Sequence, residues 1–147
     1  MTSLDEARHL VGMDHGLATV STVRASGSIQ TTVVHAGVVP HPVGGTDVAA
    51  FVARGGTAKI RHLRARSQAT LVWRAGWAWV AVEGHAELCG PDDPLPGVDP
   101  EGTRVLLRGI CLAAGVPQED WDEYDRLAAA ERRTAVLVTP RRLYRNP

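Results

Sequence analysis

Seven short segments rich in β-branched residues constrain the fold of this chain more than any other feature. Most are separated by turn-forming residues, such as Ser26-Gly27 and Ala75-Gly76. Short strands joined by turns of hairpin length are typical of antiparallel barrels. The expected strands are 16–24, 28–39, 46–54, 68–74, 77–88, 134–139 and a short one at 143–144. Helical patterns at 4–11, 58–66, 101–114 and 118–131 complete an α+β fold, with the helices at the ends or on the flank of the barrel.

The length and composition of the chain narrow its class. With 147 residues it is expected to form a single domain, 1–147. Its formal net charge of +0 gives no general attraction to nucleic acid or to an anionic membrane. No apolar stretch has the length of a signal peptide or a membrane span, so a cytoplasmic protein is expected. The two cysteines, Cys89 and Cys111, are not close in sequence and are interpreted as free thiols.

The segment from Arg54 to Arg74 carries six basic residues and no acidic one. It begins Gly55-Gly56-Thr57 and continues as a short helix that contains Lys59, the only lysine in the chain. Paired glycines let a ligand approach the backbone closely, and Thr57 is a natural helix cap. The start of a helix attracts phosphate, and the ammonium group of Lys59 could reach the same anion.

Two interpretations of this basic helix stay open. One is a phosphate-binding helix, with Arg61 extending the positive surface; the other is an amphipathic helix whose arginines face water. The spacing of a Walker A loop is absent. Ile60 and Leu63, three residues apart, would anchor the opposite side of the helix in either case.

The strand at 77–88 has two different faces. Its even positions, from Ala78 to Leu88, are apolar or small and should face the barrel core. Its odd positions begin with Trp77 and Trp79 and end with charged residues. This aromatic and polar face suits a subunit interface or a ligand cleft, although the indoles could instead pack beneath the helices of 101–131.

Other kinds of chemistry find little support. The strand at 28–39 carries Gln30, Thr31 and Thr32, which could hydrogen-bond a heteroaromatic ring but are also ordinary strand residues. The six histidines lack the spacing of a metal site, so no metal is expected. No serine lies in a nucleophile elbow, and no GxGxxG motif follows a strand.

The segment KIRHLRARSQATLVW, followed by GWAWVAVEGHAEL, resembles the flavin and deazaflavin oxidoreductases of the pyridoxamine 5′-phosphate oxidase-like split-barrel superfamily. It is most similar to their actinobacterial branch, which depends on coenzyme F420. The similarity rests on Lys59 at the start of a K-x-R-x-L-R helix and on the motif Glu83-Gly84-His85-Ala86. Members of this family often have a basic residue two positions before the lysine, whereas this chain has Thr57 at that position.

This resemblance implies an α+β fold with a six- to seven-stranded antiparallel split β-barrel and flanking helices. It also implies a homodimer with two cofactor sites at the interface. The cofactor phosphate would lie at Lys59, with Arg61 and Thr57 nearby. The ring would lie against two strands, at Gln30, Thr31 and Thr32 and at Val52 and Ala53, and the partner subunit would contribute Trp77 and Trp79.

The expected function is that of an oxidoreductase in which coenzyme F420 supplies a hydride to an activated double bond of a small organic substrate. The alternative enzyme is an FMN-dependent oxidase or reductase on the same barrel. The alternative without catalytic activity is a protein that carries a cofactor. No residue in the sequence is assigned as a proton donor.

Overall fold

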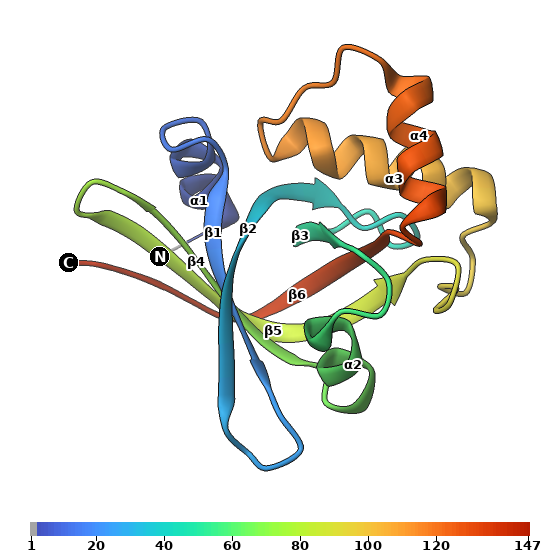
Figure 1. Ribbon diagram of the computed structural model, residues 1–147. Helices are drawn as coiled ribbons and strands as arrows, with labels where there is room; N and C mark the ends of the chain where they lie inside the picture. The colour runs from blue at the N-terminus through green and yellow to red at the C-terminus, as the bar shows by residue number, and fades with distance from the viewer. Residues whose placement is uncertain (1–2) are drawn as a thin grey trace.

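In the computed structural model, residues 3–147 form six antiparallel strands and four helices (Figure 1). The strands close into a barrel in the order β1-β2-β3-β6-β5-β4. Their bounds are β1 Leu17–Val23, β2 Ile29–Pro40, β3 Asp47–Ala53, β4 Gln68–Ala75, β5 Ala78–Cys89 and β6 Thr134–Arg145. The helices are α1 Leu4–Val11, α2 Ala58–Ala65, α3 Pro100–Ala113 and α4 Trp121–Ala130. The predicted α+β barrel is confirmed.

The one clear difference from the expected strands lies at the end of the chain. The segments 134–139 and 143–144 belong to a single strand, β6, which continues through Pro140. Proline lacks an N–H group and is tolerated in a sheet at irregular positions. The register of β5 against β6 shifts between Glu83 and Gly84, so that Gly84 pairs with Pro140 and Glu83 with Arg142. This irregularity accommodates the proline.

Strand β3 and the first part of β6, Thr134–Val138, are buried on both faces, which explains their nearly continuous apolar sequences. On one face Phe51 and Val136 fill the barrel interior, where they meet Val20, Leu71 and Val82. The opposite face belongs to a second apolar cluster, formed with α3 and α4. Its members include Val48, Ala50, Leu107, Ile110, Tyr124, Ala135 and Leu137. The helical pair therefore covers the outside of the barrel beside β3 and β6 (Figure 1).

The two remaining helices pack against the barrel core. The buried face of α1 and the buried residues Ile60 and Leu63 of α2 belong to the same interior cluster as Val20 and Leu71. In Figure 1, α1 lies beside the upper part of the barrel and α2 at its lower right. Among the described residues no helix is long and apolar enough to cross a membrane.

Strand β2 changes partner along its length. Residues 29–35 pair with β1 on one side, whereas β3 joins the other side only from Ala36 to Pro40. The first half of β2 therefore has one edge that β3 does not pair with. The alternation predicted for β5 is confirmed at Val80, Val82 and Ala86, which are buried, whereas Ala78 is exposed.

The β5 irregularity generates a stability prediction. A Cβ atom on Gly84 would lie 1.9 Å from the carbonyl oxygen of Thr139. We expect Gly84→Ala to lower the free energy of unfolding by about 1–3 kcal/mol, because the strands must move apart. Gly109→Ala is the matched control: nothing lies within 4 Å of that position in α3. It should raise stability by about 0.5–1 kcal/mol. Chemical denaturation measures both, and equal stability of the two variants would contradict the packing argument.

Candidate functional site

The connection from β3 to α2 is shaped by two glycines. A Cβ atom on Gly55 would lie 2.7 Å from the carbonyl oxygen of Arg132, so only glycine fits against that backbone. Gly56 has a φ of 81°, in the left-handed region that glycine adopts most readily. The glycines thus allow the chain to turn tightly before α2. The first N–H groups of α2 have no acceptor within the helix.

Thr57 and Arg61 lie beside this turn, as predicted, but their side chains bond locally. Thr57 occupies the N-cap position, yet its hydroxyl donates to the carbonyl oxygen of Arg54 at 3.1 Å and makes no cap hydrogen bond. Arg61 Nη1 donates to the carbonyl oxygen of Gly56 at 2.6 Å. Thr57 is therefore the N-cap residue, as predicted, but its side chain makes no cap hydrogen bond. Its hydroxyl oxygen still has capacity to accept a hydrogen bond.

Lys59 is half-buried, and it has no ion pair or side-chain hydrogen bond with any residue in the described range 3–147. Burial lowers the pKa of its ammonium group below the usual value. A partly desolvated charge without a counter-ion is unfavourable for folding. An anion bound at this position would supply the missing partner.

His62 extends the basic character of the α2 face. Its Nδ1 lies 2.9 Å from the hydroxyl oxygen of the buried Thr22 on β1. Burial and the nearby charges of Arg24, Arg66 and Arg61 all lower the pKa of His62. No carboxylate contributes to that shift. The surface around this face of α2 is therefore positive.

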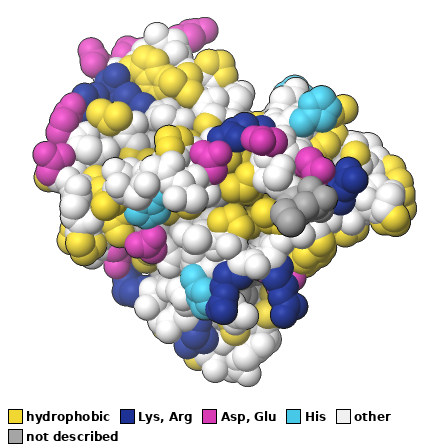
Figure 2. All heavy atoms as spheres, turned by 180° about the vertical axis from the view of Figure 1, so that it is seen from behind, with side chains coloured by type: hydrophobic (Ala, Val, Ile, Leu, Met, Phe, Trp, Pro, Cys, Tyr) yellow, Lys and Arg dark blue, Asp and Glu magenta, His cyan; other side chains and the backbone are white. Residues whose placement is uncertain are grey.

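The space-filling view agrees with this charge distribution. Figure 2 shows basic side chains gathered at the lower end of the molecule, where Figure 1 places α2 and the β1–β2 turn. Acidic side chains lie mainly toward the opposite, upper end. A protein with a net charge of +0 thus has a basic end that can attract an anionic ligand.

Strand β2 places its three predicted residues on two faces. Gln30 pairs with Thr22, and Thr32 pairs with the buried Val20, so both point to the interior side of the sheet. Thr31 points outward, and its hydroxyl lies 2.9 Å from that of Ser21. The hydroxyl of Thr32 is buried and has no hydrogen-bond partner among the described residues. Such a group costs about 1–3 kcal/mol when left unsatisfied, so it marks a position where a polar ligand atom would be favourable.

The end of β3 contributes Val52 and Ala53 to a pocket of about 530 Å³. Val33, Val34 and His35 of β2 line the same pocket. The opposite wall comes from α3, α4 and the segments that follow them: Ile110, Cys111, Ala114, Val116, Gln118, Tyr124 and Arg133, with Arg54 at the end of β3. We call this cavity the β2–β3 pocket. It lies in the range of size that suits a small organic molecule.

Two connections link the α2 residues to the strand residues. His62 of α2 contacts Thr22, which is paired with Gln30. Ala53 ends β3 only four residues before Thr57, beside the half of β2 that pairs with β1 but not with β3. The predicted residues of α2, β2 and β3 therefore lie in neighbouring parts of the fold but on two faces of the sheet. Gln30, Thr32 and Ala53 face the interior, whereas Thr31 and Val52 face outward.

The two predicted tryptophans lie elsewhere in the chain. Trp77 is in the turn between β4 and β5 and is 84% exposed, and Trp79 packs edge-on against Tyr144 with ring centroids 6.2 Å apart. In the β4–β5 ladder, Gln68 follows α2 closely, whereas the turn that holds Trp77 lies at the far end. Within one chain the tryptophans therefore do not join Lys59. They do not pack beneath α3 and α4 either.

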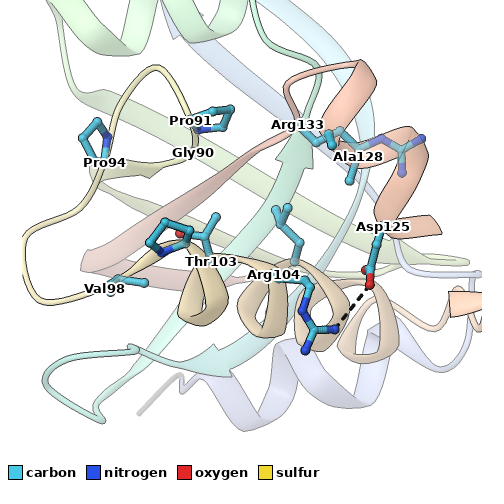
Figure 3. A pocket seen from close by; sticks show the side chains of 12 residues that line it. Gly90, Pro91, Pro94, Val98, Thr103, Arg104, Asp125, Ala128 and Arg133 are labelled. Atoms are coloured by element: carbon cyan, nitrogen blue, oxygen red, sulfur yellow. Dashed lines mark hydrogen bonds and ion pairs between the residues drawn. The ribbon is translucent and has the colours of Figure 1, made fainter. Parts of the chain in front are cut away.

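A second cavity contains none of the predicted residues. It has a volume of about 510 Å³ and lies between the proline-rich loop 90–99 and helices α3 and α4 (Figure 3). Pro91, Pro94, Val98 and Leu107 give it an apolar lining. In Figure 3, Arg104 points toward Asp125, to which it donates a hydrogen bond at 3.3 Å. We call this cavity the proline-loop pocket.

Comparison with known proteins was made at the level of sequence and of structure. Neither a protein-family profile nor the sequence of a curated protein matches the chain. Solved structures do match. A pyridoxamine 5′-phosphate oxidase-related, FMN-binding protein of Nostoc punctiforme has a TM-score of 0.65 at 14% identity, over 96% of this chain and 81% of that one. An F420 reductase has a TM-score of 0.62 at 15% identity, over 93% and 94%. The fold is a pyridoxamine 5′-phosphate oxidase-like split barrel.

Another match is a protein of unknown function from Agrobacterium tumefaciens, with a TM-score of 0.64 at 16% identity. It covers 97% of this chain, whereas this chain spans 55% of that protein. Split barrels thus occur in longer proteins as well. At such low identity these likenesses establish the fold alone.

Several residues around the candidate site were not predicted from the sequence. His62 lies three residues after Lys59 on α2, a spacing that the sequence did contain, and Arg66 follows the helix as its C-cap residue. Arg133, whose guanidinium stacks 5.1 Å from the ring centre of Tyr124, gave no such signal. Its position depends on how the end of α4 meets β6.

The charges around His62 generate a pH prediction. Because its pKa is lowered in the folded protein, the unfolded chain binds more protons as the pH falls through about 6.5. Acidification through that range should therefore destabilise the fold, and His62→Gln should weaken this dependence. Histidine titration by NMR, combined with unfolding at several pH values, checks both statements. A His62 pKa above that of a free histidine would refute them.

Proposed function

We propose that this protein binds a phosphate-bearing flavin-type cofactor, preferably the deazaflavin coenzyme F420, and is an oxidoreductase. FMN is the alternative cofactor. The observation that carries the proposal is Lys59, a half-buried cation without a counter-ion in the described chain, at the start of a basic helix on a split barrel. Solved proteins of this fold include one described as FMN-binding and one described as an F420 reductase.

The residues present fit such a cofactor. Lys59 offers a point charge for a phosphate, and the tight turn at Gly55 and Gly56 leaves the backbone accessible. Arg61 uses one N–H group on Gly56 and retains others for an anionic tail. The unpartnered hydroxyl of Thr32 and the amide of Gln30 would bond polar atoms of the ring. Val52 and Ala53 would contact its apolar surface.

The cofactor, when bound, supplies hydride transfer to an activated double bond of a small organic molecule. The side chains of this chain bind the phosphate, orient the ring and exclude water. Hydride-transfer chemistry resides in the cofactor, so the protein does not need a nucleophile. No side chain is assigned here as an acid, and the site residues given above are binding residues.

We further propose that the protein is a homodimer whose interface completes the site. The outer face of the sheet presents Leu17, Ile29 and Val33 to solvent, and Val33 is 64% exposed. Trp77, in the β4–β5 turn, and Tyr144, on β6, add exposed aromatic side chains. Large exposed apolar side chains suit an interface between subunits. Burial of this face would bring Trp77 and Trp79 of one subunit toward the site of its partner.

Removal of the Lys59 charge tests the proposed cofactor site. We expect Lys59→Met to weaken the binding of F420 or FMN at least about tenfold, as loss of a close charge contact would do. Its unfolding free energy should not fall by more than about 0.5 kcal/mol, because no partner is lost and an unpaired charge is removed. Cofactor fluorescence measures affinity. Arg126→Gln, which changes an exposed arginine on α4, is the control and should bind normally.

Binding and turnover together separate the alternatives. A yellow protein as purified, with a flavin absorption spectrum, would favour FMN. Tight binding without hydride transfer to enones, quinones and tetrapyrroles would identify a cofactor carrier. No binding of either cofactor would refute the proposal.

The proposed dimer generates its own prediction. Val33→Glu places a charge on the exposed apolar face and should raise the dimer dissociation constant by about tenfold or more. Analytical ultracentrifugation measures this constant. Thr139→Glu, at an exposed position on β6, controls for added charge. Dimers mixed from Lys59→Met and Trp77→Ala chains should regain one intact site per dimer; a monomeric original protein would contradict the proposal outright.

A further inference from the structure

The β2–β3 pocket combines apolar walls with arginine. Its apolar lining residues include Val33, Val34, Val52, Ala53, Ile110, Ala114 and Val116. Two arginines, Arg54 and Arg133, line the pocket, and no aspartate or glutamate does. His35, Gln118 and Cys111 are its other polar residues.

Both arginines form ion pairs with the same carboxylate, that of Glu131, which does not line the pocket. Arg54 Nε lies 3.1 Å from Oε2 of Glu131, and Arg133 Nε and Nη2 lie 2.8 and 2.7 Å from Oε1 of the same group. Two positive charges therefore face one negative charge. The group retains one unit of positive charge, and each guanidinium has N–H groups that these contacts do not use.

The surroundings of the arginines limit what else could neutralise them. Arg133 is mostly buried, with its side chain 21% exposed, and it stacks on Tyr124. Arg54 is more open, with a side chain that is 71% exposed. Because Arg133 is held by both the ring and Glu131, its position is fixed before any ligand arrives. A fixed cation beside an apolar wall favours a molecule with one apolar and one anionic end.

The proline-loop pocket provides an internal comparison. Its arginine, Arg104, contacts two carboxylates, Glu101 and Asp125. Asp125 is shared with Arg108. Positive and negative charges are therefore more nearly matched around that pocket, although Arg133 lines it as well. Two cavities of similar volume thus differ in the charge that they offer to a ligand.

We infer that the β2–β3 pocket binds an apolar molecule that carries a carboxylate, with the carboxylate at Arg54 and Arg133. This inference rests on the proposed function where it names the substrate: Val52 and Ala53 line the pocket and are also the residues proposed to contact the cofactor ring, so an occupant of the pocket would lie beside that ring. The substrate class is then an unsaturated carboxylic acid. Its reduction by the bound, reduced cofactor adds a hydride to one carbon of the C=C bond and a proton from water to the other.

The test uses 2-naphthoate as the probe and the cofactor-free protein. Calorimetry should give an affinity for 2-naphthoate at least about tenfold higher than for its neutral isostere 2-naphthamide. NMR shift changes should centre on the amides of Val52 and Ala114. Equal affinities for the two probes, absence of binding, or shift changes centred on the proline-loop pocket would each overturn the inference.

Three variants sharpen the test. Arg54→Gln should lower the affinity for 2-naphthoate about fivefold to tenfold and leave the affinity for 2-naphthamide unchanged. Glu131→Gln removes the competing carboxylate and should raise the affinity for 2-naphthoate by a similar factor. Loss of folding cannot produce such a gain. Arg104→Gln, in the proline-loop pocket, should change neither affinity. Opposite or absent effects of Arg54→Gln and Glu131→Gln would refute the role of these charges.

Lys59→Met distinguishes this inference from the proposed function. It should retain 2-naphthoate binding while it loses cofactor binding. Normal 2-naphthoate binding by a protein that binds neither F420 nor FMN would refute the proposed function and leave the pocket assignment standing. Cofactor binding without 2-naphthoate binding would refute the pocket assignment and leave the proposed function standing.

Discussion

The burial of Ile60 and Leu63 against the barrel interior is the interaction on which the candidate site depends. These two side chains hold α2 in the same core as Val20 and Leu71. Because α2 is only eight residues long, fixing this face also fixes the direction of Lys59 and His62. Burial of two such aliphatic side chains contributes about 3–6 kcal/mol, far more than one exposed charge contact. The core thus determines where the cation lies.

Several features of the site are unfavourable for the folded chain alone. Lys59 is partly desolvated without an anion, His62 is surrounded by three arginines, and the Thr32 hydroxyl is buried without a partner. Each of these raises the free energy of the folded state, and all belong to α2 or to the neighbouring strands β1 and β2. Polar groups left unsatisfied in one region are expected where a ligand completes them. The same three features have no common structural purpose in the absence of a ligand.

Local patterns in the sequence were sufficient for most of the fold. Strand and helix positions followed from β-branched runs, glycine turns and the 3.6-residue period. The alternation of 77–88 predicted the burial of Val80, Val82 and Ala86, whereas Ala78 is exposed and Ala81, on the opposite face, is buried. The continuation of β6 through Pro140 was missed because its shift in register depends on Gly84, far away in sequence. The assignment of Lys59, Gln30 and Val52 to one cofactor site comes from the family resemblance together with the residues, and it stays a prediction. The shared contact of Arg54 and Arg133 with Glu131 was not predictable, because it depends on where the end of α4 meets β3.

The segment from Val52 to Lys59 links the two ligand regions that are proposed here. Val52 and Arg54 line the β2–β3 pocket, and Lys59 lies only five residues after Arg54, beyond the turn formed by Gly55 and Gly56. The packing of Gly55 against the backbone of Arg132 fixes this turn to the segment that also carries Glu131 and Arg133. A shift of this turn would therefore move the proposed phosphate-binding region and the proposed carboxylate-binding region together. A side chain at Gly55 would disturb both, whereas a change of charge at either arginine would disturb only one.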